Sequence, residues 1–245
     1  MTAETLAAQI ALNPVFAAVS AVARQALVRG ATLFEAAPDQ IIFHAGAEAA
    51  HVYVLLDGVI RVFHEDKDGR QATVKHLTAP VTFAEMEVIA GCELLESTQA
   101  LTAARLVRLD ADRFRELVDR EPAATALLFK DICARFCVAA RNETAILCDV
   151  PTRLASQLLA LADLFGKPTP AGIQIRKAIN QGDLANGLGV VERSVRRTMT
   201  EWKKRGWISV HKGWLVLNRP EELEALCHGL RFNLNYGFKG AASRA

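Results

Sequence analysis

The chain has 245 residues, enough for two domains. Its composition, 51% hydrophobic and 23% charged, is that of an ordinary globular protein, and its longest apolar run is too short to span a membrane. The N-terminus lacks the basic start of a signal peptide, and five cysteines without framework spacing indicate reduced thiols, so we expect a cytoplasmic protein.

Residues 1–30 have the pattern of one or two short amphipathic helices, the second starting at Pro14. Across 31–109, short apolar runs alternate with turn residues. The segments QIIFHAG, HVYVLLDG, VIRVFHEDKDG and RQATVKHL read as successive strands, and two of them end in Asp-Gly pairs typical of hairpin turns. The fold class is therefore α+β, with a β jelly roll and its N-terminal helices over residues 1–121.

A long helix is predicted next. Asp110 can N-cap the helix ADRFRELVDR, which ends before Pro122. Residues 122–150 contain no glycine and only the initial proline, so one helix of roughly 40 Å is predicted there. Its narrow apolar stripe indicates a seam shared by two copies of the helix, unless the stripe packs on its own domain. The predicted dimer interface is Leu128, Ile132, Phe136, Ala139, Glu143 and Ile146.

Beyond this helix the charge of the chain changes sign. Residues 1–150 carry 14 Lys and Arg against 20 Asp and Glu, a net charge of −6, whereas 151–219 carry 12 against 4, a net charge of +8. A basic region of this kind suits nucleic acid, although an acidic protein partner is an alternative. We expect Pro151 to break the long helix, residues 166–172 (GKPTPAG) to form a loop, and residues 229–245 to form an extension beyond a domain at 151–228.

The segment INQGDLANGLGVVERSVRRTMTEWKKRGWISVHKGWLVLN predicts a winged helix-turn-helix. Asn180 and Asp183 form a capping-box-like start, and Gly189 supplies the tight turn. A second helix over about 192–205 has an arginine-rich outer face suited to base edges in the major groove, and a hairpin wing follows Gly206. The predicted DNA-binding residues are Glu192, Arg193, Ser194, Arg196, Arg197, Gln181 and Lys212.

Two alternatives to DNA binding have less support in the sequence. A solvated basic face on a helical bundle would need neither the glycine turn nor the hairpin that follows the second helix. An enzyme is not indicated, because the sequence has no nucleophile elbow, no phosphate-cradling glycine loop and no metal-ligand spacing such as H-x-x-x-H.

The chain resembles the CRP/FNR family of bacterial regulators, built around the cyclic-AMP receptor protein and the fumarate–nitrate reduction regulator. The resemblance covers residues 41–226 and is carried by HVYVLLDGVIRVF, LCDVPTRLASQLLALA and LANGLGVVERSVRRTMTEWKKRGWI. It implies a jelly roll like a cyclic-nucleotide-binding domain, a dimerisation helix at 122–150 and a homodimer on a palindromic double-stranded DNA operator. RNA polymerase is a further candidate partner.

The recognition helix departs from the family pattern. The family presents a glutamate and, four residues later, an arginine that contacts DNA. Here Arg193 occupies the glutamate position, Arg197 fills the arginine position, and the acid stands one residue earlier at Glu192. Val191 replaces the usual hydroxyl-bearing N-cap. Because glutamate accepts from cytosine and arginine donates to guanine, we do not expect the family's common half-site.

The effector pocket departs from the family further. The family holds a cyclic phosphate with an arginine and the ribose with a glutamate that follows a glycine. Residues 82–103 contain four glutamates and no lysine or arginine, with Ala84 at the glycine position and Glu85 at the glutamate position. A threonine–serine pair that contacts adenine is replaced by Val138-Ala139. The sequence therefore predicts cyclic-AMP independence and a degenerate pocket of Ala84, Glu85, Leu94, Leu95, Val138 and Ala139.

The effector that replaces the nucleotide stays open. No cysteine precedes Cys92, which argues against the family's N-terminal iron–sulfur cluster, and no cofactor is expected. Sensing of haem or another small molecule is the alternative, with ligands available from His44, His51, His64, His76, Met86, Cys92 and Cys133 but with no spacing that selects any. Cys133 and Cys137 share a helix face, where they could bind metal, sense oxidation or, as we favour, pack as small apolar groups.

Overall fold

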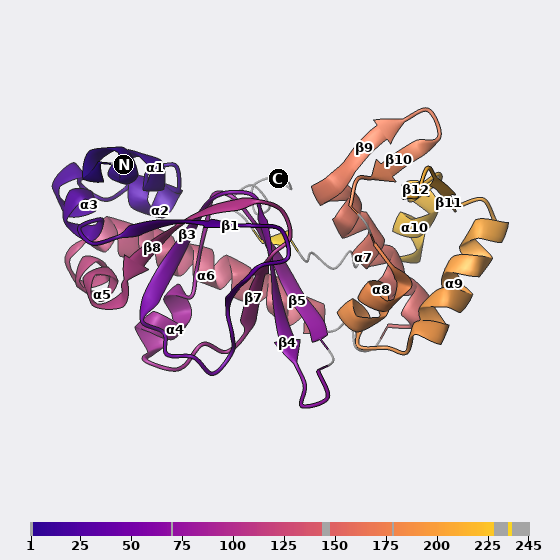
Figure 1. Ribbon diagram of the computed structural model, residues 1–245, viewed down its shortest axis with the longest axis horizontal. Coiled ribbons are helices and arrows are strands. Elements are labelled where there is room, and N and C mark those ends of the chain that lie inside the picture. Colours follow the sequence, from indigo (N-terminus) through magenta and orange to yellow (C-terminus); the bar gives the residue numbers. More distant parts are fainter. Residues whose placement is uncertain (1, 70, 144–147, 178, 228–234, 237–245) are drawn as a thin grey trace. The chain divides into compact units, whose positions relative to one another are not determined.

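The computed structural model describes residues 2–69, 71–143, 148–177, 179–227 and 235–236, and the chain divides into two compact units (Figure 1). The first contains most of the β-rich part of the chain, up to His64 and over Lys75–Phe136, together with Tyr236, and the second contains Glu65–Val74 and the described residues of Cys137–Asn235. The boundary between the units falls within a helix, so the four-part division predicted from the sequence stays a proposal.

Three short helices begin the first unit, where the sequence predicted one or two. They are α1 (Ala3–Ile10), α2 (Pro14–Ala17) and α3 (Ala21–Leu27). The third was missed because its signal is local: the Ser20 side chain accepts a hydrogen bond from the Ala23 amide and so caps α3. As predicted, the second helix begins at Pro14.

The predicted sandwich is present as two sheets. One has the order β1 (Thr32–Ala36), β8 (Ala104–Asp110), β3 (His51–Asp57) and β6 (Val81–Phe83). The other has the order β13 (Asn235–Tyr236), β5 (Gln71–Thr78), β4 (Val59–Glu65), β7 (Ser97–Ala100) and β2 (Ile41–Phe43). The four segments that the sequence identified as strands correspond to β2, β3, β4 and β5. Gly58 joins β3 to β4 with a φ of +95°, and a Cβ there would lie 2.5 Å from the Ala103 carbonyl oxygen, so only glycine fits.

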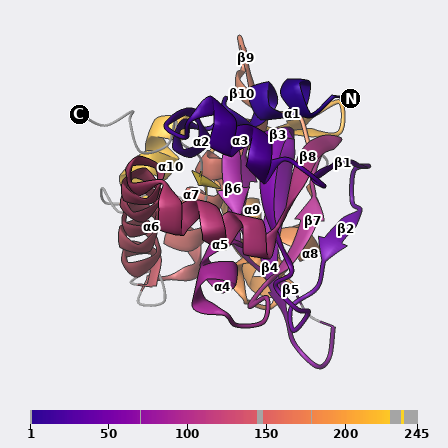
Figure 2. The same ribbon diagram turned by 90° about the vertical axis from the view of Figure 1, so that its left-hand side faces the viewer.

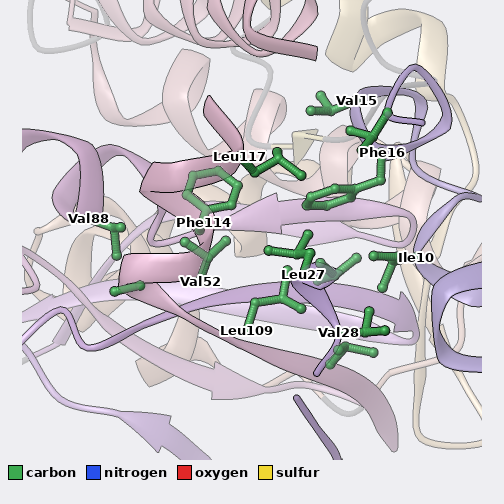
Figure 3. Close-up of a cluster of buried hydrophobic side chains, with 14 of the residues drawn as sticks. Ile10, Val15, Phe16, Leu27, Val28, Val52, Val88, Leu109, Phe114 and Leu117 are labelled. Atoms are coloured by element: carbon green, nitrogen blue, oxygen red, sulfur yellow. The ribbon is translucent and has the colours of Figure 1, made fainter. Parts of the chain in front are cut away.

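The core of this unit lies between one sheet and the helices. Figure 3 shows side chains from β3 and β8 meeting those of the N-terminal helices and of α5 (Ala111–Arg120). Phe16 and Phe114 are both fully buried there, edge to face with ring centroids 6.4 Å apart. As predicted, Asp110 caps α5 by accepting from the Arg113 amide at 3.0 Å.

Two further helices complete this unit. A short helix, α4 (Glu85–Ala90), follows β6. The long helix α6 (Pro122–Glu143) runs along one side of the sandwich (Figure 2). The sequence predicted that it continues to Val150, which is wrong: residues 144–147 lie outside the described residues, and Val150 already belongs to the next helix. The Asp149 side chain caps that helix by accepting from the Thr152 amide, so Pro151 lies in a first turn, where proline is favourable.

The second unit is a small helical domain with one sheet. It contains α7 (Val150–Phe165), β9 (Gly166–Thr169), β10 (Gly172–Ile175), α8 (Gln181–Leu188), α9 (Glu192–Lys204), β11 (Ile208–His211), β12 (Trp214–Leu217) and α10 (Pro220–Leu226). The sheet order is β11-β12-β10-β9. The predicted loop at 166–172 is therefore a hairpin. Its Pro168 is tolerated because β9 is an edge strand, while Ile173 of β10 pairs with Leu217. Among the helices that the structure describes, none has the length and hydropathy needed to cross a membrane.

Candidate nucleic-acid interface and effector pocket

The helix-turn-helix is stabilised by the capping box and the glycine turn that the sequence predicted. Asn180 Oδ1 accepts from the Asp183 amide at 2.7 Å while Asp183 accepts from the Asn180 amide, which completes the predicted capping box at the start of α8. Leu184 and Leu188 are buried, and Gly189 ends the helix in the left-handed region with a φ of +63°. These features fix the turn into α9.

The two faces of α9 are separated as predicted. Val195, Met199 and Trp202 are buried against the domain core. The opposite face is exposed and contains Glu192, Arg193, Arg196, Arg197 and Thr200, while Ser194 is half-buried at its edge. Such a helix presents its cations to a ligand without any cost to its packing.

The cations on this face differ in their partners. Arg196 pairs with Glu192 at 2.5 Å and donates to Gln181 Oε1 at 3.3 Å, which ties α9 to the start of α8. Arg193 and Arg197, by contrast, have no ion-pair partner among the described residues. Two arginines one helical turn apart therefore remain available to phosphates or base edges.

A hollow of about 810 Å³ runs beside α9 within the second unit. Basic side chains of α9 line it, together with the N-cap residue of α7 and Pro151 in the first turn of that helix. Its lining includes Asp149, Pro151, Arg193, Arg196, Arg197, Thr200, Lys204 and Arg205. The concentration of cations matches the regional charge found in the sequence.

The wing is a hairpin with a two-residue turn. Lys212 and Gly213 both adopt positive φ, at +50° and +82°, the conformation of a type I′ turn between β11 and β12. Lys212 is exposed at the tip. Its position suits a contact with DNA phosphate.

The predicted pocket region of the first unit encloses only a small cavity. Its volume is about 20 Å³, room for about one water molecule, whereas ligand pockets of proteins span roughly 300–1,000 Å³. Its lining comes from the sandwich, α4 and α6: Phe43, Val62, Lys75, Leu77, Phe83, Ala84, Glu85, Met86, Glu87, Glu96, Thr98 and Arg135.

The cavity is not without cations, which corrects the expectation from residues 82–103. Lys75 of β5 and Arg135 of α6 both reach it from outside that stretch. Each is paired: Lys75 with Glu96 at 2.7 Å, and Arg135 with Glu85 and, at 2.9 Å, with Asp131. The carboxylates of this protein therefore occupy the positive charges that an anionic ligand would need.

Ala84 and Glu85 line the cavity, as predicted. Ala84, which directly follows β6, has an unusual backbone conformation. Ala84 has a φ of +64°, in the left-handed region that glycine adopts without cost. The other four predicted pocket residues do not line the cavity in the single chain. Leu94 is buried in the helix-side core, Val138 is half-buried, and Leu95 and Ala139 are exposed. The prediction that Val138 and Ala139 of α6 line the pocket is wrong, because Arg135 is the residue of α6 that lines the cavity.

Burial changes the titration of the acids around the cavity. It raises the pKa of Glu87, whose carboxyl group is further disfavoured as an anion by nearby Glu85. Burial also raises the pKa of Asp131 in spite of its pairing with Arg135. For Arg135 itself, burial lowers the pKa, but the attraction of Glu85 and Asp131 outweighs it and the net pKa is raised. The arginine is therefore fixed as a cation between two acids.

The candidate ligands of a metal or haem are dispersed. His44, His64, Cys92 and Cys133 are exposed, while His76 is buried within β5. Among the described residues, no three His, Cys, Asp or Glu side chains are grouped as a metal site would require. The geometry thus selects none of the candidates named from the sequence.

The apolar stripe chosen for the dimer seam lies partly on the wrong side of α6. Leu128 is buried in the core of its own unit, and Ile132 packs against the same core. Phe136 is 71% exposed, as a seam residue should be, and Phe129, which was not predicted, is 68% exposed. Ile146 and the side chain of Glu143 lie outside the part of the chain that the structure describes.

Comparison with known proteins agrees with this geometry. The family model of the cyclic nucleotide-binding domain matches residues 33–121, and that of the Crp-like helix-turn-helix domain matches residues 152–226. The fold is shared with a CRP-family transcriptional regulator from Thermus thermophilus, at a TM-score of 0.65, 23% identity, and coverage of 82% of this chain and 99% of the other. The two family-model matches make the chain a transcription regulator with a helix-turn-helix DNA-binding domain rather than an enzyme.

Curated relatives of the chain are also transcription regulators. The chain is 24% identical over 184 residues (74% of this chain and 82% of the relative) to the CRP-like cAMP-activated global transcriptional regulator of Mycobacterium tuberculosis strain H37Rv. It is also 24% identical over 188 residues (76% and 84%) to the global nitrogen regulator of Nostoc sp. strain PCC 7120. The chain belongs to the CRP/FNR family of transcription regulators, as its motifs indicated.

Proposed function

We propose that the protein is a cytoplasmic homodimer that recognises a roughly palindromic operator through α9 and does so without cyclic AMP. DNA recognition is supported by the exposed Arg193 and Arg197 and by the wing lysine Lys212. In a helix-turn-helix dimer, two such faces meet successive major-groove segments about one helical turn apart.

The observation that carries cyclic-AMP independence is the cavity of about 20 Å³ with its paired cations. A phosphate in this position would have to compete with Glu85, Asp131 and Glu96 for Arg135 and Lys75. It would also have to open a space many times larger than the present one. The M. tuberculosis relative is cAMP-activated by name, so this pocket is where the two proteins should differ.

Dimerisation is supported by the exposed apolar face of α6. Two phenylalanines that are about two-thirds exposed on one helix face indicate a protein interface rather than a solvated surface. We therefore assign the interface to the face that contains Phe129 and Phe136, and remove Leu128 from it. RNA polymerase remains a candidate partner to which no surface is assigned.

Selection of bound genomic fragments by purified protein, with and without added cyclic AMP, tests the proposal. We expect the same palindromic sites under both conditions. Sites that require cyclic AMP would refute its independence, and a cation must then be released from its carboxylate to hold the nucleotide.

The variant Arg197→Ala tests the proposal that α9 is the recognition helix. A bidentate arginine–guanine contact is worth about 1–3 kcal/mol, and the dimer makes it twice, so specific binding should be lost. Lys167→Ala, which removes an exposed cation from β9, is the matched control and should bind as the parent protein does. Affinity for the operator should also fall steeply with salt, because phosphate contacts release counterions; a flat salt response would favour a protein partner for the winged helix.

A further inference from the structure

Cys133 lies at the centre of the exposed face of α6. At about 100° per residue, Ala126 and Ala140 project within about 20° of it, and Phe129 and Cys137 within about 40° on either side. All five residues are exposed in the single chain. The middle of the apolar face is thus a thiol flanked by small side chains one heptad before and after it.

A second copy of this chain is the partner that suits this face, an inference that rests on the homodimer proposed above. Six residues of the face, Ala126, Phe129, Cys133, Phe136, Cys137 and Ala140, are uncharged, and the exposed Lys130 lies at its margin, about 60° from Cys133 on the side away from Phe136. A two-fold pair of such faces brings apolar groups together and opposes no like charges. When the two helices run parallel about the axis, residues on the centre line meet their own counterparts across it.

The distances allow a covalent link at this point. Helices that pack through phenylalanine lie about 10 Å apart, and with Cα atoms about 2.3 Å from each axis, directly facing Cα atoms are about 5.4 Å apart. Disulfides span Cα separations of about 4.4–6.8 Å. Within one helix, by contrast, Cβ atoms four residues apart are about 5–6 Å apart, beyond the disulfide range of about 3.5–4.5 Å, so Cys133 and Cys137 cannot pair in an intact α6.

We propose that Cys133 and Cys133 of the partner subunit form a reversible disulfide that makes the dimer responsive to hydroperoxides. One thiolate attacks the peroxide, the O–O bond breaks, and a sulfenic acid forms while the hydroxide (or alkoxide) that leaves takes a proton from solvent to give water (or an alcohol). The second thiolate attacks the sulfenic sulfur, the S–S bond forms, and hydroxide leaves and is protonated to water. Two electrons pass from sulfur to the peroxide, and a dithiol reductant reverses the change.

The disulfide acts on the assembly of the dimer rather than on the recognition helix α9. Once joined at the middle of α6, the two subunits cannot dissociate on dilution. Operator occupancy at low protein concentration then depends on the oxidised fraction. In the reduced state, occupancy follows the ordinary monomer–dimer equilibrium.

The test uses full-length protein treated with hydrogen peroxide and separated on non-reducing gels. We expect a dithiothreitol-sensitive dimer band in the parent protein and in Cys137→Ser and Cys92→Ser, and its loss in Cys133→Ser. Cys92 is the matched control because it is exposed in the first unit but lies outside α6. A band that persists in Cys133→Ser, or disappears in Cys137→Ser alone, would overturn the assignment.

Sedimentation of the reduced protein distinguishes a failure of the proposed disulfide from a failure of the proposed homodimer. A reduced dimer that peroxide does not cross-link refutes the disulfide and leaves the proposed function intact. A reduced monomer at micromolar concentration refutes the proposed dimer. On diluted protein, fluorescence anisotropy with operator DNA should show tighter apparent binding after oxidation in the parent protein and no change in Cys133→Ser.

Discussion

Replacement of Arg135 by methionine should destabilise the β-rich unit by about 3–5 kcal/mol, the usual cost of removing one partner from a buried ion pair. The cost should fall in this range because the Glu85 side chain is only 1% exposed and would remain buried as an uncompensated anion. Arg135 also pairs with Asp131, which is itself largely buried. Methionine preserves most of the apolar stem, so that the loss reports on charge rather than on packing.

The location of the aromatic residues gives this measurement an internal control. The three tryptophans, Trp202, Trp207 and Trp214, all lie in the second unit, so tryptophan fluorescence follows that unit during urea unfolding. Hydrogen exchange of the β3 and β8 amides follows the first unit. We expect faster exchange there in Arg135→Met, with an unchanged tryptophan transition.

A double substitution tests the reasoning directly. In Glu85→Met with Arg135→Met, both charges of this pair are removed, and part of the lost stability should return because apolar groups replace the buried pair at little cost, while Asp131 stays without its partner Arg135. A loss below about 1 kcal/mol in Arg135→Met would show that the pair is effectively solvated. A double variant as unstable as the single one would mean that Arg135 acts through packing or through Asp131 rather than through Glu85.

Three further substitutions have defined outcomes. Ala84→Gly should stabilise the first unit by about 1 kcal/mol, measured by hydrogen exchange, because it relieves a left-handed backbone; an Ala84→Val control should destabilise it. Val191→Ser should stabilise the second unit by about 1 kcal/mol in tryptophan-monitored unfolding, since the exposed Val191 N-cap makes no side-chain hydrogen bond to α9. The raised pKa of Glu87 means that its carboxyl group stabilises the fold only when protonated, and that this contribution is lost as the pH rises through the folded-state pKa. Glu87→Gln should therefore be more thermally stable than the parent protein at pH 7, with a difference that shrinks as the pH falls toward the ordinary carboxyl range; a difference independent of pH would contradict this.

The features predicted correctly from the sequence are those that depend on neighbouring residues. The Asn180 capping box, the Gly189 turn and the hairpin wing after Gly206 each require only a few residues around a fixed backbone conformation. The buried face of α9 was also predictable, because its period of 3.6 residues is strong and one side is basic.

The features missed are those that depend on tertiary contacts. Arg135 lies 50 residues from Glu85, and Lys75 lies 21 residues from Glu96, so no local reading joins either pair. On α6, one apolar stripe packs on the unit's own core and another is exposed, and periodicity does not tell which stripe faces which neighbour. The β9 hairpin was missed because the strand that anchors it to the sheet, β12, lies about 40 residues further along the chain.

Arg135 and Phe136 are consecutive residues of one rigid helix, the first held inside the cavity and the second exposed on the apolar face. A rotation of α6 about its axis that withdraws the guanidinium from Glu85 turns Phe136 through the same angle, because both residues belong to the same helix backbone. The ion pair therefore acts as a rotational stop for α6. In the dimer proposed above, a molecule that broke this ion pair would change the packing between subunits without touching it, and the angle of that rotation would set the size of the response.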